Sequence, residues 1–78
     1  MAGILIKDVL RAQKALHSSP VFALRELQVE PQGSTLLISG RVGSFYHKQL
    51  AQEVVLAVSE GIEIVNSIVV RENAPAMS

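Results

Sequence analysis

The sequence predicts an α+β fold, a two-layer αββαβ sandwich in which two helices pack on one face of a three-stranded mixed sheet. Two stretches repeat apolar residues at helical spacing, two others alternate apolar and polar residues around a short Pro/Gly turn, and a last stretch is rich in β-branched residues. At 78 residues the chain has the length of one domain. We therefore expect a single domain over 1–78, with its core at about 4–71 and a flexible tail at 72–78.

The composition excludes several classes of protein. Hydrophobic residues make up 49% of the chain and charged residues 18%, which favours a folded domain over disorder. Seven basic residues balance seven acidic ones, so the chain lacks a broad electrostatic footprint for nucleic acid. The sequence has no cysteine, and disulfides and thiolate metal sites are therefore excluded.

The sequence also bears on localisation. No apolar run approaches the ~18 residues of a membrane span. The first segment is interrupted by Lys7 and Asp8 and has no basic leader, so it does not have the pattern of a signal peptide. We expect a cytoplasmic protein from the chain as written, or one of the cell envelope or periplasm if the chain is a fragment of a longer exported protein.

Residues 4–18 are predicted to form the first helix. The residues of its predicted core face are Ile6, Val9, Leu10, Gln13 and Leu16, flanked by Leu5 and Ala12. The three cations Lys7, Arg11 and Lys14 gather on the adjacent face. Cations beside an apolar stripe are typical of a helix that contacts anionic lipid, and a solvated helix face is the alternative. Pro20 ends the helix, because proline disfavours helical geometry in the residue before it.

The next two predicted elements form an antiparallel hairpin. Residues 21–30 hold Leu27 and Val29 in alternation with polar residues, and residues 31–34 have the composition of a turn. Residues 35–42 alternate again. Their predicted inward face consists of Leu36, Ile38, Gly40 and Val42.

A second helix is predicted over 45–59, with Ser44 as its N-cap. Its predicted inward stripe consists of Ala51, Val54, Val55 and Val58, with Leu50 at the border. Gly61 is the expected C-terminal stop of this helix. The β-branched residues 62–71 then form the last strand, and the helix is the crossover between two strands of one sheet.

The order and spacing of these residues resemble the BON domain, a family named for bacterial osmotic-shock and nodulation proteins. The matching positions are Leu27 and Val29, the strand with Leu36, Ile38, Gly40 and Val42, then Ala51, and the end Gly61, Ile62, Val65, Asn66, Ile68 and Val70. The resemblance spans about residues 8–70 and implies an αββαβ fold without catalysis. It also implies a module that binds phospholipid surfaces or other proteins, mostly in bacterial envelopes.

The stretch Gly40-Arg41-Val42-Gly43 has two interpretations. With Ser44 and Lys48 it has the residues of a phosphate cradle, and a GxxG pattern also clamps nucleic acid in KH domains. However, the KH pattern lies between two helices, whereas this one starts inside a predicted strand. We interpret Gly40 as the point where a helix backbone approaches the strand closely, and Gly43 as the exit from strand to helix. Nucleic-acid binding through Arg41 and Lys48 is kept as a remote alternative.

No catalytic, metal or cofactor site is predicted. The histidines, His17 and His47, are far apart in sequence and lack the spacing of zinc ligands. No serine occupies a nucleophile elbow, and no carboxylate pair sits in an apolar segment. Asn66 is assigned a structural role, because an asparagine inside a strand is favourable only where its amide is used.

The remaining candidates are surface residues. The predicted partner surface consists of Leu37, Phe45, Leu56 and Val69, which fall outside the predicted core faces. The candidate lipid or anion contacts are Lys7, Arg11, Lys14, Arg41 and Lys48. We expect a non-catalytic binding module for an anionic phospholipid or a protein partner, with no nucleic acid. A structural or self-associating domain, hence a homo-oligomer, is the alternative.

Overall fold

The structure is a computed structural model that describes residues 3–71, so the expected tail at 72–78 lies outside the described residues. The chain forms α1 (Ile6–His17), a short 3₁₀ helix η1 (Phe22–Leu24), β1 (Gln28–Gln32), β2 (Thr35–Ser39), β3 (Arg41–Val42), α2 (Phe45–Ala57), β4 (Glu63–Asn66) and β5 (Val69–Val70).

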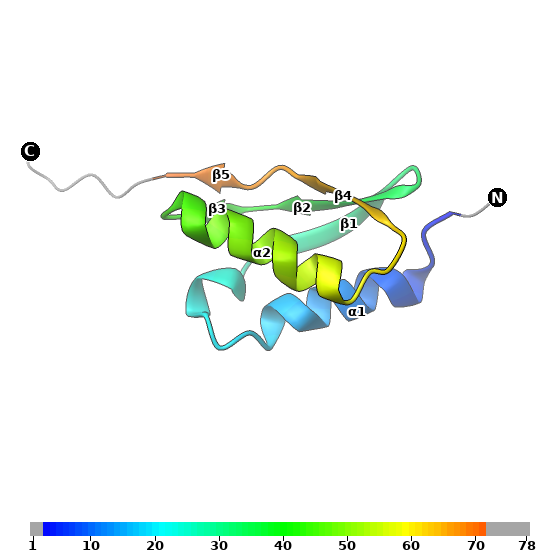
Figure 1. Cartoon of the computed structure of the whole chain (residues 1–78), viewed down its shortest axis with the longest axis horizontal. Helices are drawn as coiled ribbons and strands as arrows, with labels where there is room; N and C mark the ends of the chain where they lie inside the picture. Colours follow the sequence, from blue (N-terminus) through cyan, green and yellow to red (C-terminus); the bar gives the residue numbers. More distant parts are fainter. Residues whose placement is uncertain (1–2, 72–78) are drawn as a thin grey trace, which may run out of the picture.

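The predicted α+β architecture is confirmed. The main sheet has three strands in the order β1-β2-β4, with β1 antiparallel and β4 parallel to β2. Figure 1 shows α1 and α2 together on one side of this sheet, and α2 connects the two parallel strands. The opposite side of the sheet, called here the open face, has no helix among residues 3–71.

One core lies between the helices and the sheet. Strand alternation places Leu36 and Ile38 of β2 in this core, where both are fully buried. The buried side chains of the helices and loops that meet them are Ala12, Leu16, Leu24, Leu27, Ala51, Val55 and Ile68. The predicted inward stripe of α2 packs as expected, since Leu50, Val54 and Val58 also contact the core.

The first predicted strand, residues 21–30, differs from the structure at both ends. Residues 22–24 are the 3₁₀ helix η1, and β1 begins only at Gln28 and continues through Pro31 to Gln32. The turn is therefore limited to Gly33 and Ser34, since Gln32 pairs with Thr35. Gly33 has a φ of 62° at the first central position, as a type II′ turn requires.

The two remaining predicted strands are each divided. Residues 35–42 form β2 and β3, interrupted at Gly40, and residues 62–71 form β4 and β5, interrupted at Ser67 and Ile68. β3 and β5 pair in parallel, with Arg41 opposite Val69. This short two-stranded sheet continues the direction of β2 and β4, as Figure 1 shows.

The glycine assignments need correction. Gly40 approaches Leu27 rather than a helix: a Cβ at Gly40 would lie 2.7 Å from Leu27 Cδ2, and its φ is 129°. Gly43 has no positive φ, and a Cβ there would have no heavy atom within 4 Å, so the exit from β3 does not require a glycine. α2 ends at Ala57, and Gly61 (φ 76°) instead occupies the third position of the turn closed by the hydrogen bond from Ile62 N to Ser59 O.

Two polar residues that the sequence analysis singled out make side-chain hydrogen bonds. Ser44 caps α2, since its Oγ accepts a hydrogen bond from His47 N at 3.2 Å. The Asn66 side chain donates to Lys48 O at 2.9 Å and to Gln52 Oε1 at 3.1 Å. Its Oδ1 accepts from Ile68 N at 3.2 Å. Asn66 thus joins the end of β4 to helix α2.

Candidate functional sites

An open cleft forms where the hairpin ladder ends. The register of β1 and β2 pairs Gln28 with Ser39. Extending this register by one residue on each strand places Leu27 opposite Gly40, and the two residues are in close contact. The next step would place Glu26 opposite Arg41, but neither residue belongs to a β1–β2 pair. A cleft of about 560 Å³ occupies this position instead. We call it the arginine cleft, and it is lined by Glu26, Gly40, Arg41, Val69 and Arg71.

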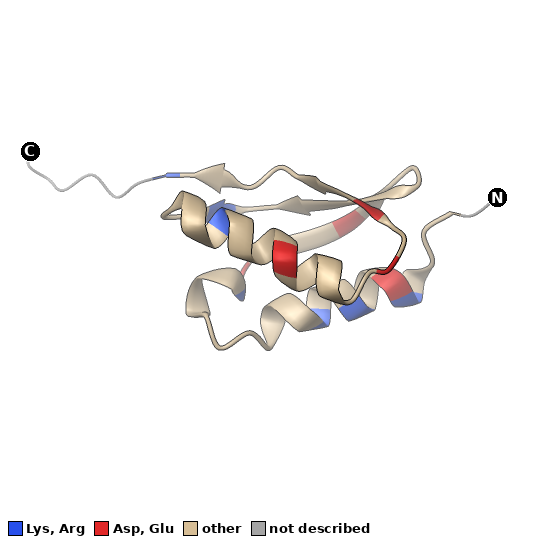
Figure 2. Cartoon of the chain, in the orientation of Figure 1, with Lys and Arg blue, Asp and Glu red and all other residues tan. Residues whose placement is uncertain are grey.

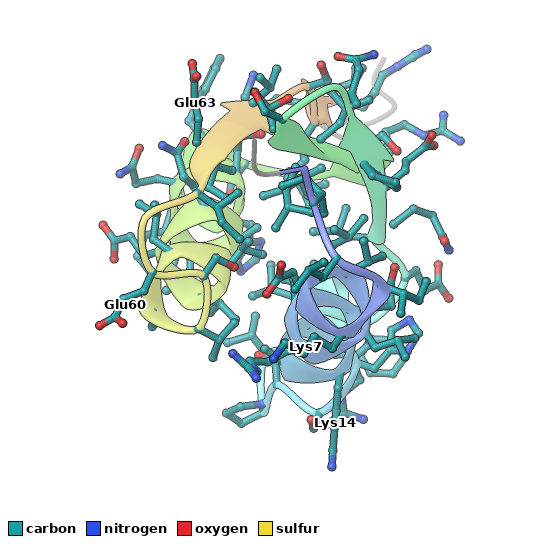
Figure 3. The ribbon with its side chains drawn as sticks, turned by 90° about the vertical axis from the view of Figure 1, so that its right-hand side faces the viewer. Lys7, Lys14, Glu60 and Glu63 are labelled. Atoms are coloured by element: carbon teal, nitrogen blue, oxygen red, sulfur yellow. The ribbon has the colours of Figure 1, made fainter. Side chains whose placement is uncertain are left out.

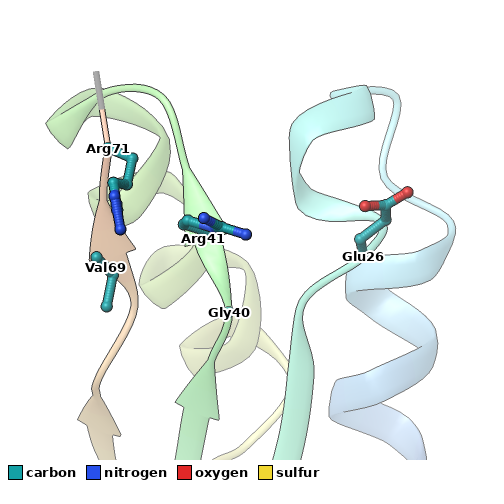
Figure 4. Close-up of a pocket in the computed structure, with 5 residues that line it drawn as sticks. All are labelled: Glu26, Gly40, Arg41, Val69 and Arg71. Carbon is teal, nitrogen blue, oxygen red and sulfur yellow. The ribbon is translucent and has the colours of Figure 1, made fainter. Parts of the chain in front are cut away.

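Figure 4 shows how the walls of the arginine cleft are built. Arg41 and Arg71 come from the β3–β5 side, and Glu26 stands on the opposite wall, ahead of β1. Gly40 O and Val42 O accept hydrogen bonds from Val69 N and Arg71 N at 2.9 and 2.8 Å. Because neighbouring residues of a strand point their backbone groups to opposite sides, the N–H and C=O of Arg41 face the cleft.

The arginine cleft has the chemistry of an anion contact. Arginine presents a planar fork of donors that matches carboxylate and phosphate oxygens. Two guanidinium groups against one carboxylate leave the cleft with an excess of positive charge. Its apolar contribution comes from Val69, and a neighbouring hollow is lined by the exposed ring of Phe22. The guanidinium carbon of Arg25 lies 5.5 Å from the centre of that ring.

A second surface is the outer face of α1. The rotation of this helix about its axis differs from the prediction. Ile6 and Leu10 were expected in the core but are 72% and 61% exposed. The buried residues of α1 are Ala12 and Leu16, with Val9 packed beside them. The orientation of the helix is set in part by the polar side chain of Gln13. The amide of Gln13 turns toward the sheet, where it donates to Leu27 O just before β1 and accepts from Val29 N of β1.

The outer face of α1 therefore combines apolar and basic side chains. At about 100° per residue, Ile6 and Leu10 lie 40° apart on the helix, and the cations follow within the next 100°. We define this surface by Ile6, Lys7, Leu10, Arg11 and Lys14. Figure 2 shows the basic residues spread along α1, while the turn before β4 and the start of β4 are acidic. In Figure 3, Lys14 extends from α1 away from the sheet, and Glu63 lies at the sheet end of the molecule.

The structure separates the other predicted contacts. Arg41 lies in the arginine cleft and Lys48 is half-buried on α2, so neither joins the cations of α1. Leu37 lies on β2 of the main sheet and Val69 on β5 of the short two-stranded sheet. Phe45 and Leu56 are exposed on α2, which covers the other face of the main sheet. The predicted partner surface is therefore not one continuous patch.

Some residues of these surfaces were missed by sequence reasoning. Arg71 and Glu26 line the arginine cleft only because β5 pairs with β3 and the hairpin ladder opens. The alternation that placed Arg41 and Val69 outward also places Arg71 outward, and this was a usable signal. Tyr46, the second residue of α2, belongs to neither surface, but it was also missed: it is exposed, and the centre of its ring lies 5.5 Å from that of His47.

Metal-ligating groups do not gather within residues 3–71, where no three His, Cys, Asp or Glu side chains come together. His17 instead lies beside Gln13, with the two Nε2 atoms 3.0 Å apart. No helix within residues 3–71 combines the length and the apolar character that crossing a bilayer demands. Comparison of the chain with protein-family models, with curated proteins and with solved structures finds no match.

Proposed function

We propose that the chain is a non-catalytic binding module that contacts an anionic phospholipid surface through the outer face of α1. The observation that carries the proposal is the exposure of Ile6 and Leu10 beside Lys7, Arg11 and Lys14. Exposed apolar side chains of a helix insert at the boundary between headgroups and acyl chains. Each flanking cation contributes roughly 1 kcal/mol near an anionic leaflet.

Membership of the BON family and a bacterial origin are part of the same proposal, supported by the resemblance in sequence pattern and by the order of helices and strands. The compartment follows from it: the inner leaflet if the chain is cytoplasmic, or the envelope if it belongs to an exported protein. A protein partner with an anionic surface is the alternative, and the arginine cleft offers it a second contact.

Co-sedimentation with vesicles tests the proposal. We expect the chain to pellet with vesicles of phosphatidylcholine and phosphatidylglycerol, and to stay in solution with phosphatidylcholine alone. Raising the salt from about 0.1 M to about 1 M shortens the Debye length from roughly 10 Å to 3 Å, so most of the binding should be lost.

A charge-matched pair of variants locates the contact. The triple variant Lys7→Gln, Arg11→Gln, Lys14→Gln should lose the binding to anionic vesicles. The control Arg41→Gln, Lys48→Gln, Arg71→Gln removes the same number of charges from the rest of the molecule and should keep it. Equal losses of vesicle binding in both variants would show that binding depends on net charge and not on the outer face of α1. Failure of the parent chain to bind anionic vesicles would rule out the lipid proposal.

A further inference from the structure

The two edges of the main sheet differ in their free hydrogen-bonding groups. On the β1 edge, Val29 N donates to Gln13 Oε1 at 2.8 Å, and Gln13 Nε2 donates to Leu27 O at 2.7 Å. The next residue of β1 that faces this edge is Pro31, which has no N–H. A side chain and a proline thus close this edge to a further strand.

The β4 edge has groups that remain free. Ser67 N donates to Ile38 O at 2.9 Å, so the backbone groups of residues 63, 65 and 67 face β2. Those of Ile64 and Asn66 face away from it, because successive residues alternate. β4 is the outer strand of the sheet, and within residues 3–71 no hydrogen bond joins the N–H of Ile64 or Asn66 to another segment. Beyond Asn66 the edge is closed, since Ile68 N is bonded to Asn66 Oδ1.

We propose that β4 pairs antiparallel with β4 of a second copy of the chain, about a twofold axis at Val65. This register places Ile64 opposite Asn66 of the second copy and forms four N–H···O bonds from the free groups alone. An axis at Ile64 would need Ile62 N, which is bonded to Ser59 O. An axis at Asn66 would need Ile68 N, which is also taken.

The side chains fit the same register. The carboxylate of Glu63 faces Ser67 of the second copy rather than the equivalent glutamate, so like charges are not opposed. Val65 faces its own counterpart on the open face. Leu37 pairs with Val65 in the β2–β4 ladder. Leu37 and Val65 of the first copy and Val65 and Leu37 of the second therefore form one apolar row across the axis. The association thus uses the sheet edge first and the half-buried Leu37 and Val65 second.

Single-cysteine variants give a direct test, because the chain has no cysteine of its own. Residues opposite each other at a non-hydrogen-bonded antiparallel position have Cα atoms about 4.5 Å apart, inside the range of about 4.4–6.8 Å for a disulfide. Val65→Cys should therefore form a covalent dimer under mild oxidation. The controls Val69→Cys and Leu37→Cys should stay largely monomeric, because Cα atoms more than about 7 Å apart cannot be bridged without backbone movement. Equal rates among the three variants, or no dimer from Val65→Cys, would overturn the proposal.

Sedimentation equilibrium supplies a second measurement that needs no cysteine. The parent chain should show a concentration-dependent monomer–dimer equilibrium. Val65→Lys should be monomeric, because two ammonium groups would meet at the axis. Gln28→Lys adds the same charge at an exposed position on β1, the far strand of the sheet, and should still dimerise. A monomeric parent chain, or loss of the dimer in Gln28→Lys as well, would contradict pairing at the β4 edge. Neither lysine variant alters the outer face of α1, so a failure of the dimer proposal can be distinguished from a failure of the lipid proposal.

Discussion

At the scale of single residues, the glycines of the Gly40-Arg41-Val42-Gly43 stretch have different roles. Gly40 combines a φ of 129° with a close approach to Leu27, and Gly43 has neither a positive φ nor a close neighbour. We expect Gly40→Ala to lower the free energy of unfolding by about 1–3 kcal/mol, because alanine is strained at that φ. Urea unfolding followed by far-ultraviolet circular dichroism measures the change.

Gly43→Ala is the matched control. It should leave the stability unchanged or raise it by up to about 1 kcal/mol, since alanine restricts the unfolded chain. Similar losses in both variants would show that the stretch acts as one rigid unit, contrary to the geometry described above.

Residue roles were predictable where they depend on near neighbours. The capping role of Ser44 follows from the residues beside it, and the structural role of Asn66 follows from its place in a β-branched run. The exposure of Ile6 and Leu10 was predicted wrongly, because spacing defines an apolar arc of α1 but not which part of it meets the sheet. That choice depends on Gln13 and its partners Leu27 and Val29, which are 14 and 16 residues away.

At the scale of elements, one side-chain amide joins α1 to β1. Gln13→Met keeps the length of the side chain but leaves Val29 N–H and Leu27 O without their partners. We expect this variant to lose about 1–3 kcal/mol of unfolding free energy, since a buried polar group without a partner costs that much. Gln28→Met, an exposed change on the same strand, should remain within about 0.5 kcal/mol of the parent in the same urea unfolding.

The elements themselves were predicted well and their interruptions poorly. The hairpin, both helices and the last strand occur where the apolar periodicity places them. The division of 35–42 at Gly40 was missed, because it depends on Leu27 and on the pairing of β3 with β5. Parallel pairing across a helix is not encoded in local spacing, and neither is the arginine cleft that results from it.

At the scale of the whole molecule, a chain of this length has an unfolding free energy of about 4–12 kcal/mol, and the structure describes one core. Leu24 and Phe22 lie on the same turn of η1, but Leu24 is fully buried and Phe22 is 72% exposed. Leu24→Ala should therefore cost about 2–5 kcal/mol, a large share of the total, and the unfolding midpoint in urea should fall accordingly. Phe22→Ala should change it by no more than about 0.5 kcal/mol. A larger loss of unfolding free energy in Phe22→Ala would contradict the exposure of that ring, because it would show that the ring makes a stabilising contact.

The exposure of the aromatic side chains has a practical consequence. The chain has two phenylalanines, one tyrosine and no tryptophan, and Phe22, Phe45 and Tyr46 are all more than two-thirds exposed. The packed interior therefore contains no chromophore of its own, and tyrosine emission reports the solvent near the start of α2 rather than the packing of the core. Tyrosine emission should therefore change when a ligand or a partner binds near the start of α2.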